Sequence, residues 1–211
     1  MKLKALVLAV ISLLPVAASA HQVGDFFMRV GSATVRPTGG SDDVMGLGEF
    51  NIDNNTQMGL TFTYMATDYI GVELLGATPF KHHVGLQATG TLATVHQLPP
   101  TLMAQWYPMG NSSKWQPYAG VGVNYTMFYD TDFNQTGRDA GLSNLSVKNS
   151  WGLAGQVGLD YQLTPDWLIN ASLWYMDINT KVRFDSAAAG RQSIDTHINP
   201  WVFFFGAGYT F

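Results

Sequence analysis

The last eleven residues of the chain alternate between large aromatic side chains and mostly small ones. One set of alternate positions holds Trp201, Phe203, Phe205, Ala207, Tyr209 and Phe211, and the other holds Val202, Phe204, Gly206, Gly208 and Thr210. Successive side chains of a β-strand point to opposite faces, so this pattern predicts a two-faced strand that ends at the carboxyl terminus. Taken alone, the pattern fits a membrane barrel or the core of a soluble sandwich.

Seven further segments alternate in the same way. They are residues 26–36, 56–65, 70–78, 98–107, 116–127, 150–163 and 167–178. Most are near the ~9–11 residues that a tilted membrane strand needs. The links after the second, fourth and sixth segments are short and the others are long, which is the asymmetry of outer-membrane barrels. The chain is therefore predicted to be all-β, an eight-stranded antiparallel transmembrane β-barrel with short periplasmic turns and long extracellular loops.

The composition agrees with a membrane barrel. Charged residues make up 12% of the chain and aromatic residues 13%, and there is no cysteine. The charged share is about half of the ~25% that is usual in globular domains. The net charge of −4 argues against a nucleic-acid partner, and no glycine-rich phosphate loop follows a strand, so no cofactor is predicted.

The amino-terminal residues have the pattern of a secretory signal peptide. Lys2 and Lys4 precede an apolar run, and Ala18-Ser19-Ala20 supplies the small residues of a cleavage site. The apolar run is shorter than the ~20 residues of a membrane-spanning helix. We therefore expect residues 1–20 to be a signal peptide and residues 21–211 to form one barrel domain.

Strand parity assigns three charged residues to the inside of the barrel near its periplasmic end. Arg29 lies early in the first strand, Glu73 early in the third and Asp160 late in the sixth. A charge inside a narrow barrel must be paired, so the three are predicted to form an ionic floor. The alternative is three separate polar residues, each solvated by water in the lumen.

Higher in the lumen, parity predicts apolar side chains near mid-height. These are Leu75, Ala77, Trp174, Met176 and Phe204. An eight-stranded barrel is just wide enough for side chains to fill it, so this set either fills the interior or lines a funnel for an apolar ligand.

Prolines occur at the extracellular end of one predicted hairpin. Pro79 follows the third strand, and Pro99 and Pro100 lie at the start of the fourth. Proline cannot donate to a strand ladder. The three residues either end the strands below a loop or leave a lateral gate through which an apolar solute reaches the bilayer.

Histidines are confined to the predicted loops. His82, His83 and His96 share the second long loop and His197 lies by the fourth, without the spacing of a zinc site. Some outer-membrane barrels modify lipids, but such an enzyme needs a histidine in a strand beside a nucleophile or carboxylate. No predicted strand contains one, so we expect neither catalysis nor a metal site.

Five stretches resemble the OmpW family of Gram-negative outer-membrane proteins. They are residues 26–37, 60–65, 98–107, 155–161 and 199–211. The resemblance implies an outer-membrane barrel with a narrow hydrophobic lumen that takes up small hydrophobic molecules, and surface loops open to bacteriocins or phages. It favours the funnel over a filled, structural or adhesive barrel. The closing strand resembles the signal read by the barrel assembly machinery, here Phe203, Phe205, Tyr209 and Phe211.

Overall fold

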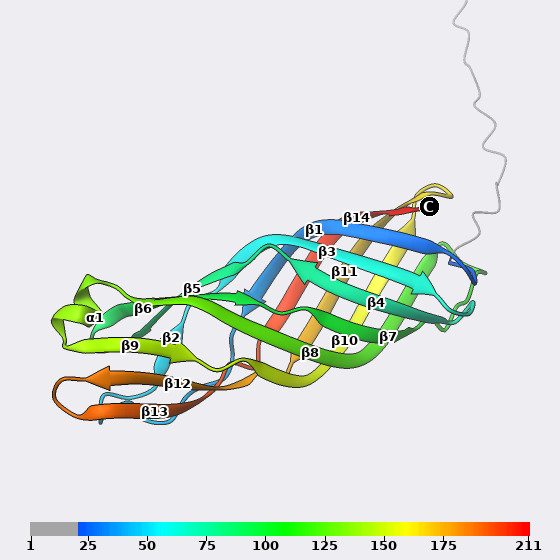
Figure 1. Ribbon diagram of the computed structural model, residues 1–211. Helices are drawn as coiled ribbons and strands as arrows, with labels where there is room; N and C mark the ends of the chain where they lie inside the picture. The colour runs from blue at the N-terminus through cyan, green and yellow to red at the C-terminus, as the bar shows by residue number, and fades with distance from the viewer. Residues whose placement is uncertain (1–20) are drawn as a thin grey trace, which may run out of the picture.

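Eight strands form a closed antiparallel barrel in the computed structural model, which describes residues 21–211 (Figure 1). In order around the wall they are β1 (Phe26–Arg36), β3 (Asn55–Met65), β4 (Ile70–Ala77), β7 (Thr101–Trp106), β8 (Trp115–Phe133), β10 (Ser150–Gln162), β11 (Trp167–Met176) and β14 (Trp201–Thr210). The last strand pairs with the first, from Phe27–Thr210 to Arg36–Trp201, and closes the circle. The predicted fold class is confirmed. The predicted signal peptide lies outside the described residues.

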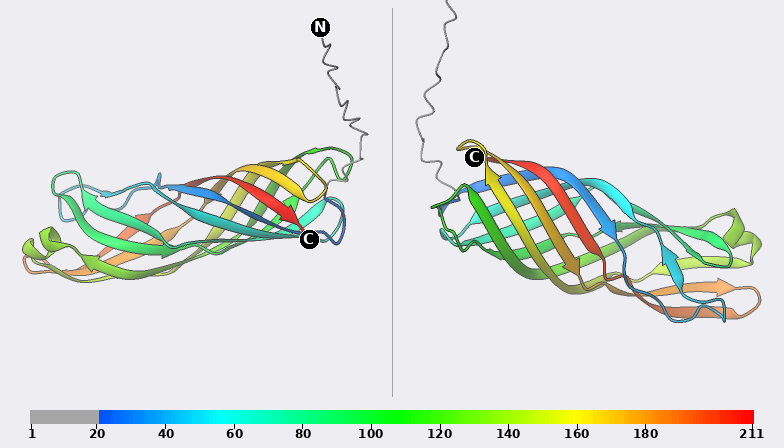
Figure 2. Two further views of the ribbon diagram at one scale, coloured as in Figure 1. Left: turned by 90° about the horizontal axis from the view of Figure 1, so that it is seen from above. Right: turned by 180° about the vertical axis from the view of Figure 1, so that it is seen from behind.

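The short turns, the start of β1 and the carboxyl terminus lie at one end of the barrel (Figures 1 and 2). This is the periplasmic end, because outer-membrane barrels have short periplasmic turns. Outward-facing aromatic rings gather here, among them Trp115 beside Tyr161 and Trp167 beside Tyr209. A second group lies near the other end of the wall and pairs Tyr125 with Trp151 and Tyr175 with Trp201. Such girdles mark the two membrane interfaces.

The segments predicted as long extracellular loops contain strands and build an extension beyond the wall (Figure 2). It contains β2 (Phe50–Ile52), β5 (Phe80–Leu86), β6 (Gly90–Leu98), α1 (Gln135–Asp139), β9 (Leu142–Val147), β12 (Asn179–Ser186) and β13 (Gly190–His197), together with the upper part of β8. Within residues 21–211, no helix has the length and hydropathy needed to cross a membrane.

Two tight hairpins account for most of the extension. Gly90 and Gly190 each have a positive φ, of 70° and 68°, at the tips of the β5–β6 and β12–β13 hairpins. Glycine reaches this conformation without steric cost, so both tips can turn sharply.

One predicted strand is corrected by this arrangement. The segment 98–107 is divided, because Leu98 ends β6 and the wall strand β7 begins only at Thr101.

Three apolar clusters follow one another along the interior, from the periplasmic end to the extension. The periplasmic cluster contains Phe27, Met65, Tyr107, Tyr118 and Leu168. The middle cluster contains Ala33, Val35, Leu75, Phe80, Met103, Ala154, Trp174, Met176, Ile178, Ile198, Val202 and Phe204. The extracellular cluster lies within the extension and contains Val44, Leu86, Leu92, Ala93, Phe133, Leu142, Val182, Phe184 and Ile194.

Replacing Phe203 and Phe205 together with Asp should block barrel assembly. Both rings point outward from β14 and are about half exposed or more on the lipid-facing surface, at 47% and 66%. A charge on that surface costs up to ~2–4 kcal/mol at the bilayer midplane for Lys or Arg, and less for Asp. The heat-modifiable folded band on a denaturing gel should disappear from the outer-membrane fraction. The matched control, Phe203→Leu with Phe205→Leu, should retain it. A normal folded band from the Asp variant would contradict the prediction.

Candidate functional site

Arg29 lies at the centre of a buried polar network between the periplasmic and middle clusters. Its Nη1 is 2.6 Å from Glu73 Oε2, and its Nε and Nη2 hold both carboxylate oxygens of Asp160 at 3.0 and 2.5 Å. The remaining guanidinium hydrogens are donated to Thr63 Oγ1 and the Tyr107 hydroxyl. All five N–H donors of the guanidinium therefore have acceptors, as a buried arginine requires. The structure brings together the three residues assigned to the ionic floor.

The two carboxylates have further partners that the sequence did not single out. Gln105 and Gln156 each donate an amide hydrogen to Glu73 Oε1, at 2.8 and 3.0 Å. Asn170 donates to Asp160 Oδ1 at 2.7 Å. These glutamines and the asparagine are inward-facing and uncharged, so only their register shows that they share one network.

His21 extends the same network toward the periplasm. Its Nε2 lies 2.9 Å from Asp160 Oδ2, and its ring stacks on Phe27 with centroids 4.2 Å apart. Arg29 alone supplies one positive charge against two carboxylates, and His21 is a further hydrogen-bond partner of Asp160. The layer is thus a continuous polar partition across the lumen, with Arg29, Glu73 and Asp160 all at most 1% exposed.

The apolar residues predicted near mid-height pack against one another above this partition. Leu75, Trp174, Met176 and Phe204 are buried in the middle cluster, and Ala77 packs against it. None of the five lines the cavity described below. At the level of these side chains the lumen is closed by packing, and an apolar solute could pass only if the cluster moved.

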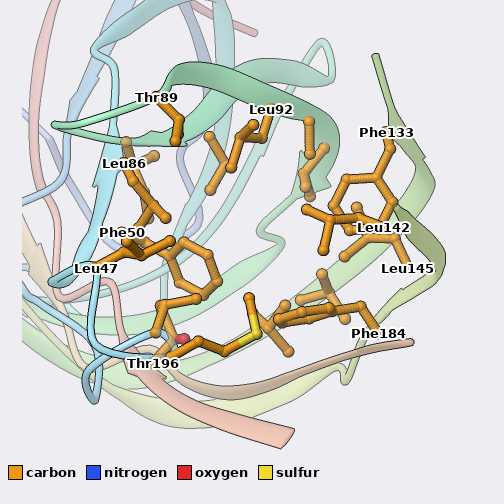
Figure 3. A pocket seen from close by; sticks show the side chains of 18 of the residues that line it. Leu47, Phe50, Leu86, Thr89, Leu92, Phe133, Leu142, Leu145, Phe184 and Thr196 are labelled. Atoms are coloured by element: carbon orange, nitrogen blue, oxygen red, sulfur yellow. The ribbon is translucent and has the colours of Figure 1, made fainter. Parts of the chain in front are cut away.

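An apolar cavity of about 420 Å³ lies above the middle cluster, inside the extension (Figure 3). Every strand of the extension contributes to its wall, with Phe50, Leu86, Leu92, Phe133 and Phe184 among the side chains. The volume falls within the ~300–1,000 Å³ of typical small-ligand pockets. The sequence pattern did not predict this cavity because these segments were expected to be loops.

The barrel wall is interrupted close to the lower end of the cavity. The β4–β7 ladder ends at Leu75–Thr101, and the β5–β6 ladder resumes at Phe80–Gln97. Within residues 21–211, no strand pairing joins residues 76–79 to residues 98–100 across this interval. The three prolines assigned to a lateral gate, Pro79, Pro99 and Pro100, all lie in it.

The histidines of the second loop lie in strands, which corrects the expectation that strands contain none. His82 and His83 are in β5, His96 is in β6 and His197 ends β13. His82 points into the cavity wall, whereas His83 faces outward and lies 2.9 Å from Asp53 Oδ2. Among the described residues, no group of three or more His, Cys, Asp or Glu side chains could hold a metal ion.

Removing Arg29 alone should destabilise the barrel more than neutralising the whole ion-pair layer. Arg29→Ala leaves two buried carboxylates without their cation, and breaking a buried pair costs about 3–5 kcal/mol. Arg29→Met combined with Glu73→Gln and Asp160→Asn removes all three charges at similar volume. The midpoint of urea unfolding, followed by the heat-modifiable band, should be lower for the single variant than for the triple variant.

A matched control uses an exposed ion pair of the extension. Arg191 lies 3.2 Å from Asp185 and is 82% exposed, so Arg191→Ala should leave the midpoint nearly unchanged. Equal midpoints for the single and triple variants would show that Arg29, Glu73 and Asp160 do not act as a unit.

Comparison with known proteins agrees with the architecture over nearly the whole chain. The sequence profile of the OmpW family matches residues 22–211. The chain is 59% identical over 211 residues to outer membrane protein W of Escherichia coli (strain K12), covering 100% of this chain and 99% of that protein. The crystal structure of outer membrane protein OprG from Pseudomonas aeruginosa superimposes with a TM-score of 0.86 and 44% identity, covering 92% of this chain and 98% of that one. The solution structure of E. coli outer membrane protein W gives a TM-score of 0.64 and 60% identity, covering 91% of this chain and 100% of that one. This chain therefore belongs to the OmpW family of Gram-negative outer-membrane β-barrel proteins.

Proposed function

We propose that this outer-membrane barrel is a passive entry route for small hydrophobic molecules, which leave it sideways into the bilayer. The observation that carries the proposal is the apolar cavity in the extension, whose lining is mostly hydrophobic. Burying apolar surface yields about 25 cal/mol per Å², so such a cavity favours a hydrocarbon-like solute over an ion or a sugar.

A straight path to the periplasm is opposed by two layers. The packed middle cluster lies directly beneath the cavity, and the Arg29–Glu73–Asp160 partition lies beneath that. An apolar solute that reached the partition would displace hydrogen bonds to charged groups and give none in return. The ionic floor then acts as a barrier to apolar solutes, and the cavity needs another exit.

The interrupted wall supplies that exit. Gln97 lines the cavity and is followed within three residues by Pro99 and Pro100. Opposite them, residues 76–79 have no ladder partner on the β7 side, although Thr78 still donates to Met58 of β3. Separating these two segments would break no strand pairing, so a solute could move from the lower cavity into lipid between them.

A filled barrel with a structural or adhesive role is the second candidate, favoured by the packed middle cluster.

The extension is also the part of the molecule that a bacteriocin or phage would meet first, since it projects beyond the extracellular girdle (Figure 2). Measured uptake of an apolar compound into cells distinguishes transport from a structural, adhesive or receptor role. The closing strand is proposed as the contact for the assembly machinery.

A disulfide across the interrupted wall should slow uptake of an apolar compound. The register of Leu75–Thr101, continued by two residues, sets Ala77 opposite Pro99, and the chain has no cysteine of its own. We therefore expect Ala77→Cys with Pro99→Cys to lower the accumulation of a fluorescent apolar compound toward the level of cells without the protein. Reductant should restore it.

The control places a disulfide inside an intact ladder. Thr34 and Thr56 are paired across β1 and β3, with hydroxyl oxygens 2.9 Å apart, so Thr34→Cys with Thr56→Cys should crosslink without changing uptake. Unchanged uptake with the Ala77–Pro99 crosslink confirmed by mass spectrometry would remove the lateral exit. Equal accumulation in cells with and without the native protein would remove the transport function itself.

A further inference from the structure

Three buried polar atoms in the wall of the extension cavity have no hydrogen-bond partner within the described chain. They are His82 Nε2, Gln97 Nε2 and Thr196 Oγ1, and the three residues are at most 3% exposed. An unpaired buried donor or acceptor costs about 1–3 kcal/mol, so such atoms are uncommon in a native protein. Their presence in a mostly apolar cavity wall favours a ligand that carries a polar group.

The hydrogen bonding of His82 determines what its free nitrogen can do. Its Nδ1 lies 2.9 Å from the backbone carbonyl oxygen of Asp53, which can only accept, so Nδ1 carries the proton. Burial lowers the pKa of His82, with the Asp53 carbonyl and carboxylate offsetting part of that effect. At neutral pH the ring is therefore neutral, and Nε2 presents a lone pair that accepts a hydrogen bond.

Gln97 places a donor beside this acceptor. Phe80 pairs with Gln97 and His82 pairs with Val95 across the β5–β6 hairpin, so His82 and Gln97 are diagonal neighbours on the same face. Long side chains at such diagonal positions lie within reach of one group. The free Nε2 of Gln97 donates, so the two residues offer one acceptor and one donor. Figure 3 shows Thr196 on the opposite side of the cavity from Leu92, where its hydroxyl adds a third polar point.

The pair discriminates among head groups that a hydrophobic ligand could bear. A pure hydrocarbon leaves both polar groups unpaired. A carboxylate can accept from Gln97 but meets the lone pair of His82, and no other titratable side chain lines the cavity to neutralise its charge. A hydroxyl fits, because it donates to His82 and accepts from Gln97 at the same time.

Building on the proposed transport function, we propose that the cavity selects neutral, hydroxyl-bearing hydrophobes. The hydroxyl lies between His82 and Gln97, and the hydrocarbon chain lies along the apolar wall formed by residues such as Phe50, Leu86 and Phe133. The ligand class is thus that of a medium-chain alcohol rather than an alkane or a fatty-acid anion. The shape of the cavity supplies affinity, and the polar pair supplies selectivity.

The test measures binding of decanol, its methyl ether, decane and decanoate to the full protein in lipid nanodiscs, by displacement of a fluorescent apolar probe. The ether can accept a hydrogen bond but cannot donate one. Decanol should bind about tenfold more tightly than the ether, as expected for one net hydrogen bond of ~1.4 kcal/mol, and more tightly still than decane, which makes neither hydrogen bond. Decanoate should bind more weakly than decanol at neutral pH.

Variants of the polar pair should reduce this preference without abolishing binding. In His82→Phe, decanol should lose its advantage over the ether, and in Gln97→Leu the ether should bind like decane, with decane no weaker than in the native protein in either variant. His83→Phe is the matched control, because His83 is adjacent but faces outward, and it should keep the full preference. The heat-modifiable band verifies that each variant folds, and Gln97→Leu serves if His82→Phe does not.

A titration of the His82 ring by NMR gives an independent readout. A ligand that donates to neutral Nε2 stabilises the neutral ring, so decanol should lower the pKa of His82 further, and by linkage decanol should bind more weakly as the pH falls through that pKa. Decanoate should raise it. Asp53 and His83 are the titratable groups against the ring, whereas Lys81 and His96 lie on the outer face of the hairpin.

The outcomes separate the two proposals. Equal affinities for decanol and decane in the native protein would overturn the selectivity and leave transport intact. An alcohol preference that survives both His82→Phe and Gln97→Leu would do the same. Water would then be the hydrogen-bond partner of His82 and Gln97. Failure of every one of these compounds to displace the probe would instead count against the transport function.

Discussion

Hydrocarbon offers no hydrogen-bond partner to a backbone amide, and the wall of this barrel is built around that constraint. The first and last strands pair over their whole length, so the membrane segment has no free edge. The interruption at residues 76–79 and 98–100 is tolerable because its polar groups have partners elsewhere. Prolines at 99 and 100 have no N–H to leave unpaired, and their carbonyls accept from Asn124 Nδ2 and the backbone N–H of Tyr125 in β8. The proposed lateral exit would therefore not require a ladder to break.

Closure with eight strands also decides what the lumen can contain. A barrel of this size leaves room for side chains and little else. The interior is accordingly divided into an apolar periplasmic cluster, a polar partition and an apolar middle cluster. In the partition, both oxygens of Glu73 and Asp160 accept from named donors, which meets the condition for burying charge. The residues of the partition and of the middle cluster are buried by their contacts with one another.

The sequence was sufficient to predict the wall because lipid imposes an apolar outer face on every strand. Strand parity and height also placed Arg29, Glu73 and Asp160 together, since charged residues stand out among inward positions. Gln105 and Gln156 carried no comparable signal, because uncharged polar residues are ordinary inside a barrel. The extension was missed although Val182 and Phe184 alternate in β12 and Gly190 marks a turn. Its strands face solvent on one side and a cavity on the other, so their pattern is short and weak. The position of Gln97 beside His82 depends on the register of one hairpin, which the sequence does not specify.

The location of the cavity follows from these limits. Inside the membrane, a wider lumen would require more strands. Strands that continue beyond the bilayer do not have to form a closed eight-stranded barrel, so they can lie farther apart. Outside the hydrocarbon, buried polar atoms such as His82 Nε2 do not threaten the insertion of the barrel. The extension can thus combine an apolar volume with a few hydrogen-bonding groups, a combination that the packed lumen cannot offer. Because the interrupted wall begins directly below Gln97, a molecule held in the extension would lie next to an interval of the described wall that has no ladder to break.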